Sequence, residues 1–463
     1  MKTYTSLKIR ILITGMFVLA LVTNLSCKKF LDEKPDDKVT TPTRPADLQA
    51  LLDNGDKMNT KWLCYDDASA DDYFMTPENY ARLNLRGQSA YIWKQYQDEH
   101  INEWSKAADV VYISNVCLET VEKLLDTGTP EQEISNVKGS ALVYRAAAWL
   151  KWLFIHSQAY DDASAKNDLG IVLRKTADFN VPSVRSSVDE GYAQVIGDLQ
   201  LALTLLPDRP VHVMRPSKAA AYALLARTYL SMRKYDAALV NAEHSLAIKN
   251  DLIDYNTINT SLYSPFQSYN IETVFHLDIS AFTYGNLQTT YGLVDTVLYQ
   301  SYSSNDLRKA AYFGASGKYY YFKGPYVTRG ASGNNLFEGV ATDEVYLMKA
   351  ECLARLGRID EAMTTLNTLM KKRWKSTVAY PAFSAATKED ALKIVLVERR
   401  KELLFRGLRW MDIKRLNKEG YQIALKRIIS GTTYSLEPNS PRFALPIPIE
   451  IVDLAGIPQN PGW

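Results

Sequence analysis

Two carboxylates near the C-terminus have the spacing that acid–base chemistry requires. Glu398 and Glu402 are four residues apart, so a helix places both on one face, and glycoside hydrolases use carboxylate pairs about 5 to 9.5 Å apart. Arginines crowd this pair in the sequence, and guanidinium groups keep carboxylates ionised instead of leaving one as a general acid. We therefore predict a structural ion-pair network that joins the helices on either side of Gly407. Its predicted members are Glu398, Arg399, Glu402, Arg409 and Asp412.

Other catalytic patterns are incomplete. The five histidines include no His-Glu-x-x-His pair, and Gly314–Lys318 lacks the full phosphate-loop spacing. Gly330-Ala-Ser-Gly is not a nucleophile elbow, and the acidic pairs Asp66-Asp67 and Asp71-Asp72 lack the spacing of a calcium loop. The sequence therefore predicts a protein that is not an enzyme and that uses no cofactor and no metal.

Aromatic residues mixed with polar ones indicate a different chemistry, the binding of sugars. Pyranose rings have apolar C–H faces edged by hydroxyl groups, so a sugar site combines aromatic rings with hydrogen-bonding side chains. Tyrosine is abundant, with 29 copies, and residues 62–93 and 255–326 are the richest segments. Ordinary packing is the competing interpretation for each ring. The candidate ligand-binding residues are Trp93 and Tyr73, as the platform, with Asp71, Trp62, Tyr80, Arg82, Tyr284 and Tyr291.

Helical hairpins must position these residues. Pro216–Ile248 reads as two amphipathic helices with alanines at helical spacing, and Asp343–Met370 repeats the pattern, since Ala350 and Ala362 keep the twelve-residue spacing of Ala226 and Ala238. This is a tetratricopeptide-like signature, in which small residues allow two helices to pack closely. The sequence pattern of residues 255–326, between the two copies, predicts short strands and long loops.

The N-terminus predicts export. Lys2, Lys8 and Arg10 precede an apolar run over residues 11–22, which is too short to span a bilayer but suits a signal peptide. Ser26 stands before Cys27 as in a bacterial lipobox, so we expect cleavage before Cys27 and lipidation of its thiol; the alternative is a plain secretory signal.

The remaining composition narrows the class further. A formal net charge of +2 over 463 residues predicts no nucleic-acid partner. Cys117 and Cys352 lie within apolar helical patterns, which is typical of buried free thiols.

Several motifs together resemble the SusD/RagB family of outer-membrane nutrient-binding lipoproteins. They are Cys27 followed by Phe-Leu-Asp-x-x-Pro, the hairpin pairs, the segment Glu398–Arg415, the Pro446-Ile-Pro motif and the terminal Pro458–Trp463. Arg406 departs from the family pattern, which usually has Glu there. The resemblance implies an α-dominated, tetratricopeptide-like scaffold with irregular loops and a few short strands. It also implies a SusC-like TonB-dependent transporter as partner, an oligosaccharide ligand and a surface-exposed position, lipid-anchored in the outer membrane.

Combining these observations, we expect a signal peptide over residues 1–26 and a lipidated tether over 27–44. A single domain then covers 45–463, with an N-terminal part to about 250, the tyrosine-rich insertion over about 251–340 and a C-terminal part from about 341. The predicted function is capture of an oligosaccharide for the transporter. Capture of peptides and a scaffold that binds only a protein partner remain the alternatives.

Overall fold

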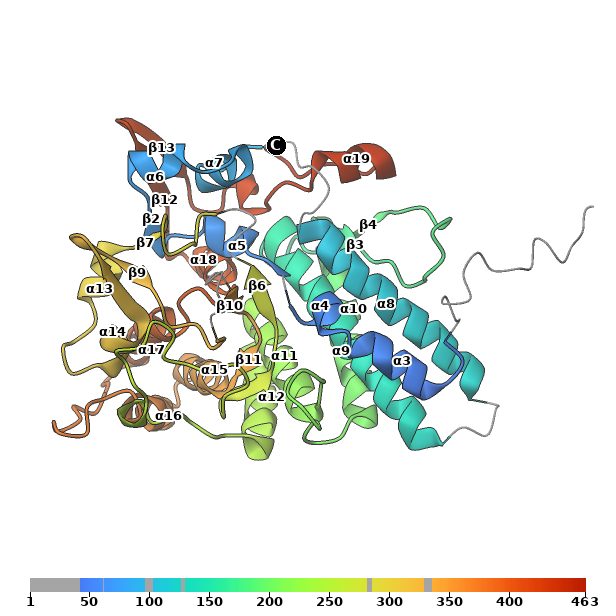
Figure 1. Ribbon diagram of the computed structural model, residues 1–463, viewed down its shortest axis with the longest axis horizontal. Coiled ribbons are helices and arrows are strands. Elements are labelled where there is room, and N and C mark those ends of the chain that lie inside the picture. Colours follow the sequence, from blue (N-terminus) through green and yellow to red (C-terminus); the bar gives the residue numbers. More distant parts are fainter. Residues whose placement is uncertain (1–41, 61, 96–102, 126–129, 281–284, 329–334) are drawn as a thin grey trace, which may run out of the picture. The chain divides into compact units, whose positions relative to one another are not determined.

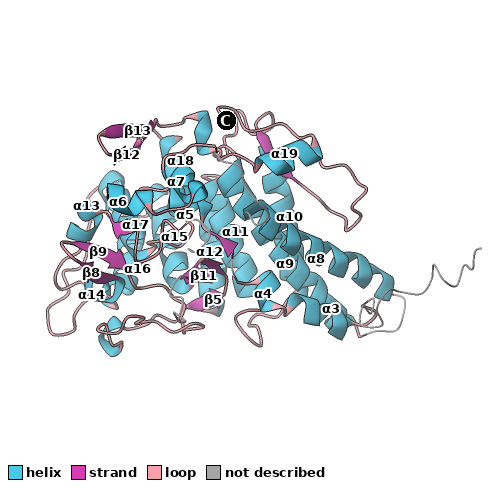
Figure 2. Cartoon of the chain, turned by 45° about the horizontal axis from the view of Figure 1, so that its top comes forward, coloured by secondary structure: helices cyan, strands magenta, loops and turns pink. Residues whose placement is uncertain are grey.

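Helices dominate the part of the chain that the structure describes, and its strands are short (Figure 2). The computed structural model describes residues 42–60, 62–95, 103–125, 130–280, 285–328 and 335–463 (Figure 1). The predicted α-dominated fold class is confirmed. The signal peptide, Cys27 and nearly all of the predicted tether lie outside the described residues. Residues 44–463 form one compact unit, and the following description concerns that unit.

Long helices build one side of this unit. In Figure 1, α8, α9 and α10 lie side by side, and α9 packs against both of its neighbours. A capping box fixes the start of α10, because the Ser187 hydroxyl accepts from the Glu190 amide while the Glu190 carboxylate accepts from the Ser187 amide. The long helices are α8 (Glu103–Leu124), α9 (Glu131–His156), α10 (Val188–Leu205), α11 (Lys218–Ser231), α12 (Tyr235–Ile248), α15 (Thr342–Arg355), α16 (Ile359–Lys371), α17 (Lys388–Glu402) and α18 (Arg409–Asn417).

The hairpin α11–α12 forms where the alanine pattern predicts it. Ser217 caps α11 by accepting a hydrogen bond from the Ala220 amide, and Arg233 adopts a φ of 63° in the turn. Ala223, Ala226, Ala238 and Ala242 are fully buried, so the predicted burial of the alanine face is confirmed. The small side chains let α11 and α12 pack closely along their whole length.

The second predicted hairpin, α15–α16, packs directly against the first. Ala350 and Ala362 are fully buried, and α12 packs on α15. The tyrosine-rich insertion therefore separates the two hairpins in sequence but not in space. Gly357, with a φ of 77°, makes the turn that joins α15 to α16.

The last long helical segment is interrupted as predicted. α17 ends at Glu402 and α18 begins at Arg409, with Gly407 at a φ of 69° between them. A Cβ at Gly407 would lie 2.6 Å from a carboxylate oxygen of Glu338, so both the turn and the close approach favour glycine.

Short strands connect the N-terminal segment to the insertion. β6 pairs with β1 in parallel and with β10 antiparallel, while β7 pairs with β2 and β11 pairs with β5. The strands of these segments are β1 (Trp62–Leu63), β2 (Tyr73–Phe74), β5 (Thr273–Phe275), β6 (Asp278–Ser280), β7 (Leu293–Val294), β8 (Phe313–Ser316), β9 (Tyr319–Phe322), β10 (Asn335–Phe337) and β11 (Val340–Ala341). The described part of the insertion contains the predicted small strands and loops, but it also contains two short α-helices, over residues 296–300 and 307–312, that the sequence pattern did not predict.

The remaining α-helices of the described residues are short. They are α3 (Pro45–Leu52), α4 (Gly55–Met58), α5 (Tyr65–Ser69), α6 (Pro77–Ala81), α7 (Leu85–Tyr91), α13 (Thr296–Gln300), α14 (Leu307–Tyr312) and α19 (Ile449–Ala455), with one-turn 3₁₀ helices at Tyr255–Thr257 and Pro441–Phe443. Beside α10, β3 (Leu169–Val172) pairs with β4 (Arg185–Ser187).

The C-terminal tail that follows α18 contains a β-hairpin and the short helix α19. β12 (Leu425–Ile429) and β13 (Thr432–Leu436) form an antiparallel hairpin. The two ends of the tail then meet through two hydrogen bonds between Gln459 and Ile447. The side chain of Gln459 accepts from the Ile447 amide at 2.8 Å and donates to the Ile447 carbonyl at 2.7 Å. Asn460 donates to the carbonyl of His156 at the end of α9. The two proline motifs thus fasten the tail to the helical scaffold.

Cys64, Cys117 and Cys352 are buried and free, which confirms the prediction for the last two. Among the described helices, none is both long and apolar enough to cross a membrane. Within the same residues, no group of three His, Cys, Asp or Glu side chains is placed to hold a metal ion.

Candidate ligand-binding surface

Four partly exposed aromatic rings and one arginine gather where the N-terminal segment meets the insertion. Phe74, Tyr80, Tyr291 and Tyr319 are half-buried and Arg82 is exposed. The ring centres of Phe74 and Tyr319 lie 5.1 Å apart at 79°, and the Arg82 guanidinium carbon lies 5.2 Å from the centre of the Tyr291 ring. We call this group the tyrosine surface.

Backbone pairing brings the two segments of the tyrosine surface together. Strand β2 pairs with β7 so that Phe74 lies opposite Leu293, two residues after Tyr291. The side-chain amide of Asn79 on α6 donates to the Tyr291 carbonyl at 3.1 Å. Thr76 caps α6 by accepting from the Asn79 amide, which fixes the turn that carries Tyr80. More than 200 residues of sequence separate the partners, yet these contacts join them.

Strand β9 contributes rings to opposite faces, as alternation along a strand requires. Tyr319 contacts Phe74, while Tyr320 stacks on Tyr299 of α13 with centroids 3.6 Å apart. Burial, followed by the neighbouring Tyr320, raises the pKa of Tyr299 to about 12, so its hydroxyl stays protonated at neutral pH. Tyr321 lies across Gly314 of β8, where an added Cβ would come within 2.3 Å of the ring.

This arrangement supplies the two kinds of contact that a sugar requires. The rings offer faces for C–H groups, and the hydroxyl, amide and guanidinium groups of Tyr80, Asn79 and Arg82 offer hydrogen bonds. Burial raises the pKa of Tyr80, which keeps its hydroxyl available as a donor. Of the predicted ligand-binding residues, the structure therefore brings Tyr80, Arg82 and Tyr291 together on one surface, beside Phe74, Asn79 and Tyr319.

The predicted platform residues occupy a different environment. Trp93 and Tyr73 are each 1% exposed, so neither offers a free ring face to a ligand, and the platform hypothesis needs correction. The guanidinium of Arg427, from β12, lies between their rings and that of Tyr91, with distances of 5.5, 4.9 and 4.4 Å to the ring centres of Trp93, Tyr73 and Tyr91. A cation from the chain itself fills the aromatic site that the sequence assigns to the ligand.

The other predicted residues divide between the core, an ion pair and the undescribed part of the chain. Trp62 is 2% exposed and donates from its indole to the Met58 carbonyl, so it belongs to the core. Asp71 accepts two hydrogen bonds from Arg409 at 2.7 and 2.9 Å. Although burial alone would raise the pKa of Asp71, Arg409 and Arg400 hold it well below its usual range. Tyr284 lies outside the described residues.

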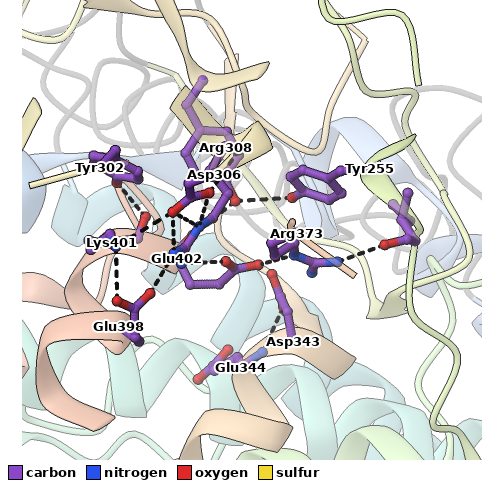
Figure 3. A network of polar contacts seen from close by, with 12 residues as sticks. Tyr255, Tyr302, Asp306, Arg308, Asp343, Glu344, Arg373, Glu398, Lys401 and Glu402 are labelled. Carbon is purple, nitrogen blue, oxygen red and sulfur yellow. Dashed lines mark hydrogen bonds and ion pairs between the residues drawn. The ribbon is translucent and has the colours of Figure 1, made fainter. Parts of the chain in front are cut away.

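The paired carboxylates of α17 lie in a buried polar network (Figure 3). Glu402 accepts from Arg308 at 3.0 Å and from Arg373 at 2.8 Å, and Glu398 accepts from Arg308 at 2.5 Å. Arg373 also pairs with Glu272 of the insertion at 2.8 Å. Both carboxylates are thus paired with buried arginines that join α17 to the insertion and to the loop after α16. Sequence proximity did not reveal Arg308 and Arg373, because both are distant from α17 along the chain.

The remaining predicted network residues form separate pairs. Arg399 on α17 donates to Asp412 on α18 at 2.8 Å, and Asp412 also accepts from Arg415 at 2.7 Å. This contact spans the break at Gly407. Arg409 instead joins α18 to the N-terminal segment through Asp71. Arg406, the departure from the family pattern, is buried and pairs with Asp343 at the start of α15 at 2.8 Å.

Sequence comparison identifies two family matches. Residues 29–230 match a family model described as "Starch-binding associating with outer membrane", and residues 341–463 match the SusD family model. A curated relative, SusD-like protein P2 of Formosa agariphila, is 26% identical over 338 residues. That match covers 59% of this chain and spans 65% of the relative, just under two thirds of its length.

Solved structures show the same fold. A putative sugar-binding protein of Bacteroides vulgatus is 23% identical, with a TM-score of 0.75 over 92% of this chain and 100% of that one. A SusD superfamily protein of Bacteroides thetaiotaomicron is 21% identical, with a TM-score of 0.74 over 90% and 100% of the two chains. A laminarin-binding SusD-like protein is 17% identical, with a TM-score of 0.64 over 90% and 98%.

Fold and surface together define the class. Helical hairpins form a rigid frame, and a loop-rich side carries aromatic and hydrogen-bonding groups, which is the architecture of a helical binding protein. The two family matches together cover more than half of the chain, and both models are of the SusD type. The chain belongs to the SusD family.

Proposed function

We propose that this protein captures an oligosaccharide on the tyrosine surface and passes it to a SusC-like TonB-dependent transporter. The observation that carries the proposal is the pairing of β2 with β7, which joins the segment of the Phe74–Tyr319 ring contact to the segment of the Arg82–Tyr291 contact. Half-exposed rings beside hydrogen-bond donors suit the C–H faces and hydroxyl edges of sugar rings. The family description as starch-binding and the laminarin-binding relative support a glycan as the ligand.

The proposal includes export and anchoring. Lipidation of Cys27 would hold the protein at the outer membrane, and two or more acyl chains are sufficient for stable attachment. Metabolic labelling with a radiolabelled fatty acid tests this step. Label in the wild type and none in Cys27→Ala supports it, whereas an unlabelled wild type contradicts it.

Binding to arrays of glycans and peptides tests the ligand class, followed by calorimetry with the strongest neutral glycan. The double substitution Tyr291→Ala/Tyr319→Ala should weaken glycan binding by roughly fivefold to 150-fold, because each ring lost removes about 0.5 to 1.5 kcal/mol of contact. Phe179→Ala is the matched control, since this ring is 75% exposed but lies between β3 and β4.

The array results separate the alternatives. Binding of peptides without glycans would replace the sugar with a peptide ligand. Binding of neither, with retention of a co-purified barrel transporter, would indicate a scaffold for a protein partner. Unchanged glycan affinity in the double variant would remove the tyrosine surface from the proposal.

A further inference from the structure

A second cavity region lies at the loop between α16 and α17, apart from the tyrosine surface. It consists of two cavities of ≈ 350 and ≈ 500 Å³, and both are lined by Trp374 and Tyr380. Volumes in this range are typical of small-molecule sites. The two cavities share no lining residue with the tyrosine surface. We call them together the Trp374 pocket.

The aromatic wall of the Trp374 pocket is held rigidly. The rings of Trp374 and Tyr380 meet edge to face, with centroids 6.1 Å apart at 72°. Asn256 donates to the Trp374 carbonyl at 3.0 Å and accepts from the Ser376 amide at 2.9 Å. Asn367 on α16 accepts from the Tyr380 hydroxyl at 2.7 Å. Because hydrogen bonds fix the loop on both sides of the rings, little ordering would be required when a ligand binds.

The charges of the two cavities differ. The smaller cavity has a floor of Asp306, Arg308, Glu398 and Lys401, all buried and paired with one another, so it offers both donors and acceptors.

The larger cavity is basic. Lys371, Lys372 and Lys375 line it, and Asp254 is the acidic residue among its lining residues. The Nζ atom of Lys372 lies 3.4 Å from a carboxylate oxygen of Asp254. Because Asp254 is paired with Lys372, the cavity lining holds no further acidic residue to pair with Lys371 or Lys375. A negative group beside Trp374 would therefore gain favourable electrostatic energy.

We propose that the Trp374 pocket is a second saccharide site that selects sugars with a carboxylate, such as hexuronic acids. A pyranose face would pack on Trp374 and Tyr380, its carboxylate would lie beside Lys371 and Lys375, and a neighbouring ring would use the mixed floor of the smaller cavity. This inference takes the ligand class from the proposed function but assigns a different surface and a charged sugar. The paired donors and acceptors of the floor suit the hydroxyl groups of a sugar, each of which both donates and accepts.

Calorimetry with trigalacturonate and with its methyl-esterified trimer tests the inference directly. The acid should bind at least roughly tenfold more tightly than the ester, and its affinity should fall as salt rises. Lys371→Gln/Lys375→Gln should weaken binding of the acid about tenfold and leave the ester unchanged. Lys388→Gln/Lys393→Gln is the matched control, because it removes two exposed charges from α17 outside the cavity lining.

Trp374→Ala should weaken binding of both trimers, and its melting curve identifies any variant that fails to fold. The inference is overturned if the wild type does not bind trigalacturonate, or if the lysine variant binds it unchanged. It is also overturned if triglutamate or adenosine monophosphate binds at least as tightly. If Tyr291→Ala/Tyr319→Ala loses trigalacturonate binding and the Trp374 pocket variants do not, trigalacturonate binds at the tyrosine surface and the inference is wrong. If Tyr291→Ala/Tyr319→Ala loses only the binding of a neutral glycan, the result supports two separate sites.

Discussion

The guanidinium carbon of Arg427 lies 5.5 Å from the centre of the Trp93 ring, and this contact joins the C-terminal hairpin to the N-terminal segment. Arg427 is buried and donates to the carbonyls of Tyr73, at 2.8 Å, and Ala70. Trp93 adopts a φ of 54°, an uncommon conformation for a bulky residue, and donates from its indole to the Ser69 carbonyl. The cluster stabilises the framework behind the tyrosine surface.

Replacing Arg427 should therefore destabilise the fold. In Arg427→Ala the aromatic rings lose a desolvated cation and two carbonyls lose charged donors, so the free energy of unfolding should fall by about 3 kcal/mol. Urea denaturation measures this change. Lys426→Ala, at the exposed neighbouring position, should be close to wild type. Equal stability of the two variants would show that the cluster contributes nothing net.

Replacing Glu402 should also destabilise the fold, for a different reason. It is fully buried between Arg308 and Arg373, so Glu402→Gln leaves two guanidinium groups without a full countercharge. The expected loss is about 3 to 5 kcal/mol, measured by denaturation. Glu389→Gln, exposed in the first turn of α17, is the control. Because the role is structural, the folded Glu402→Gln protein should keep its glycan affinity; a selective loss of affinity would instead place Glu402 in a site.

These two clusters show what the sequence predicts and what it does not. The alanine spacing of the two hairpins and the break at Gly407 are local patterns, and the structure confirms them. Glu402 and Arg427, in contrast, contact residues that are far away in the sequence, and no local pattern predicts such contacts. The two tyrosine-rich segments are joined by the pairing of β2 with β7. Tyr73 is buried on β2 while its neighbour Phe74 is half-buried, and Trp93 is buried after α7 against Arg427.

The buried His156 should make the free energy of unfolding depend on pH. It is fully buried at the end of α9, and burial, with help from Arg185 and Lys414, lowers its pKa to about 3. A histidine in an unfolded chain titrates near about 6.5. Between these values only the unfolded state binds the proton, so the stability contributed by neutral His156 is present above about pH 6.5 and is lost as pH falls toward 3.

The variant His156→Asn removes this titration. It should be less stable than wild type at pH 7, because the smaller side chain leaves a cavity. As pH falls from 7 to 5 only the wild type loses the contribution of neutral His156, so the difference in unfolding free energy between the two proteins should narrow by about 2 kcal/mol. Denaturation of both proteins at each pH measures it. A difference that stays constant over this range would mean that His156 titrates normally in the folded protein.

Gly314 offers a way to disturb the ligand-binding side without unfolding the scaffold. An alanine Cβ at this position would lie 2.3 Å from Cζ of Tyr321, the far end of a half-buried side chain on the neighbouring strand. The ring can therefore swing away at small cost, and the shift should spread along β9 to Tyr319 and its contact with Phe74. We expect Gly314→Ala to lower stability by less than about 1 kcal/mol, while glycan affinity falls severalfold. Gly197→Ala on α10 is the matched control, since its Cβ meets no atom within 4 Å and alanine favours helix. Wild-type affinity in Gly314→Ala, measured by calorimetry, would show that the ligand does not contact the β8–β9 hairpin, and the binding site would then lie nearer to Tyr291 and Arg82.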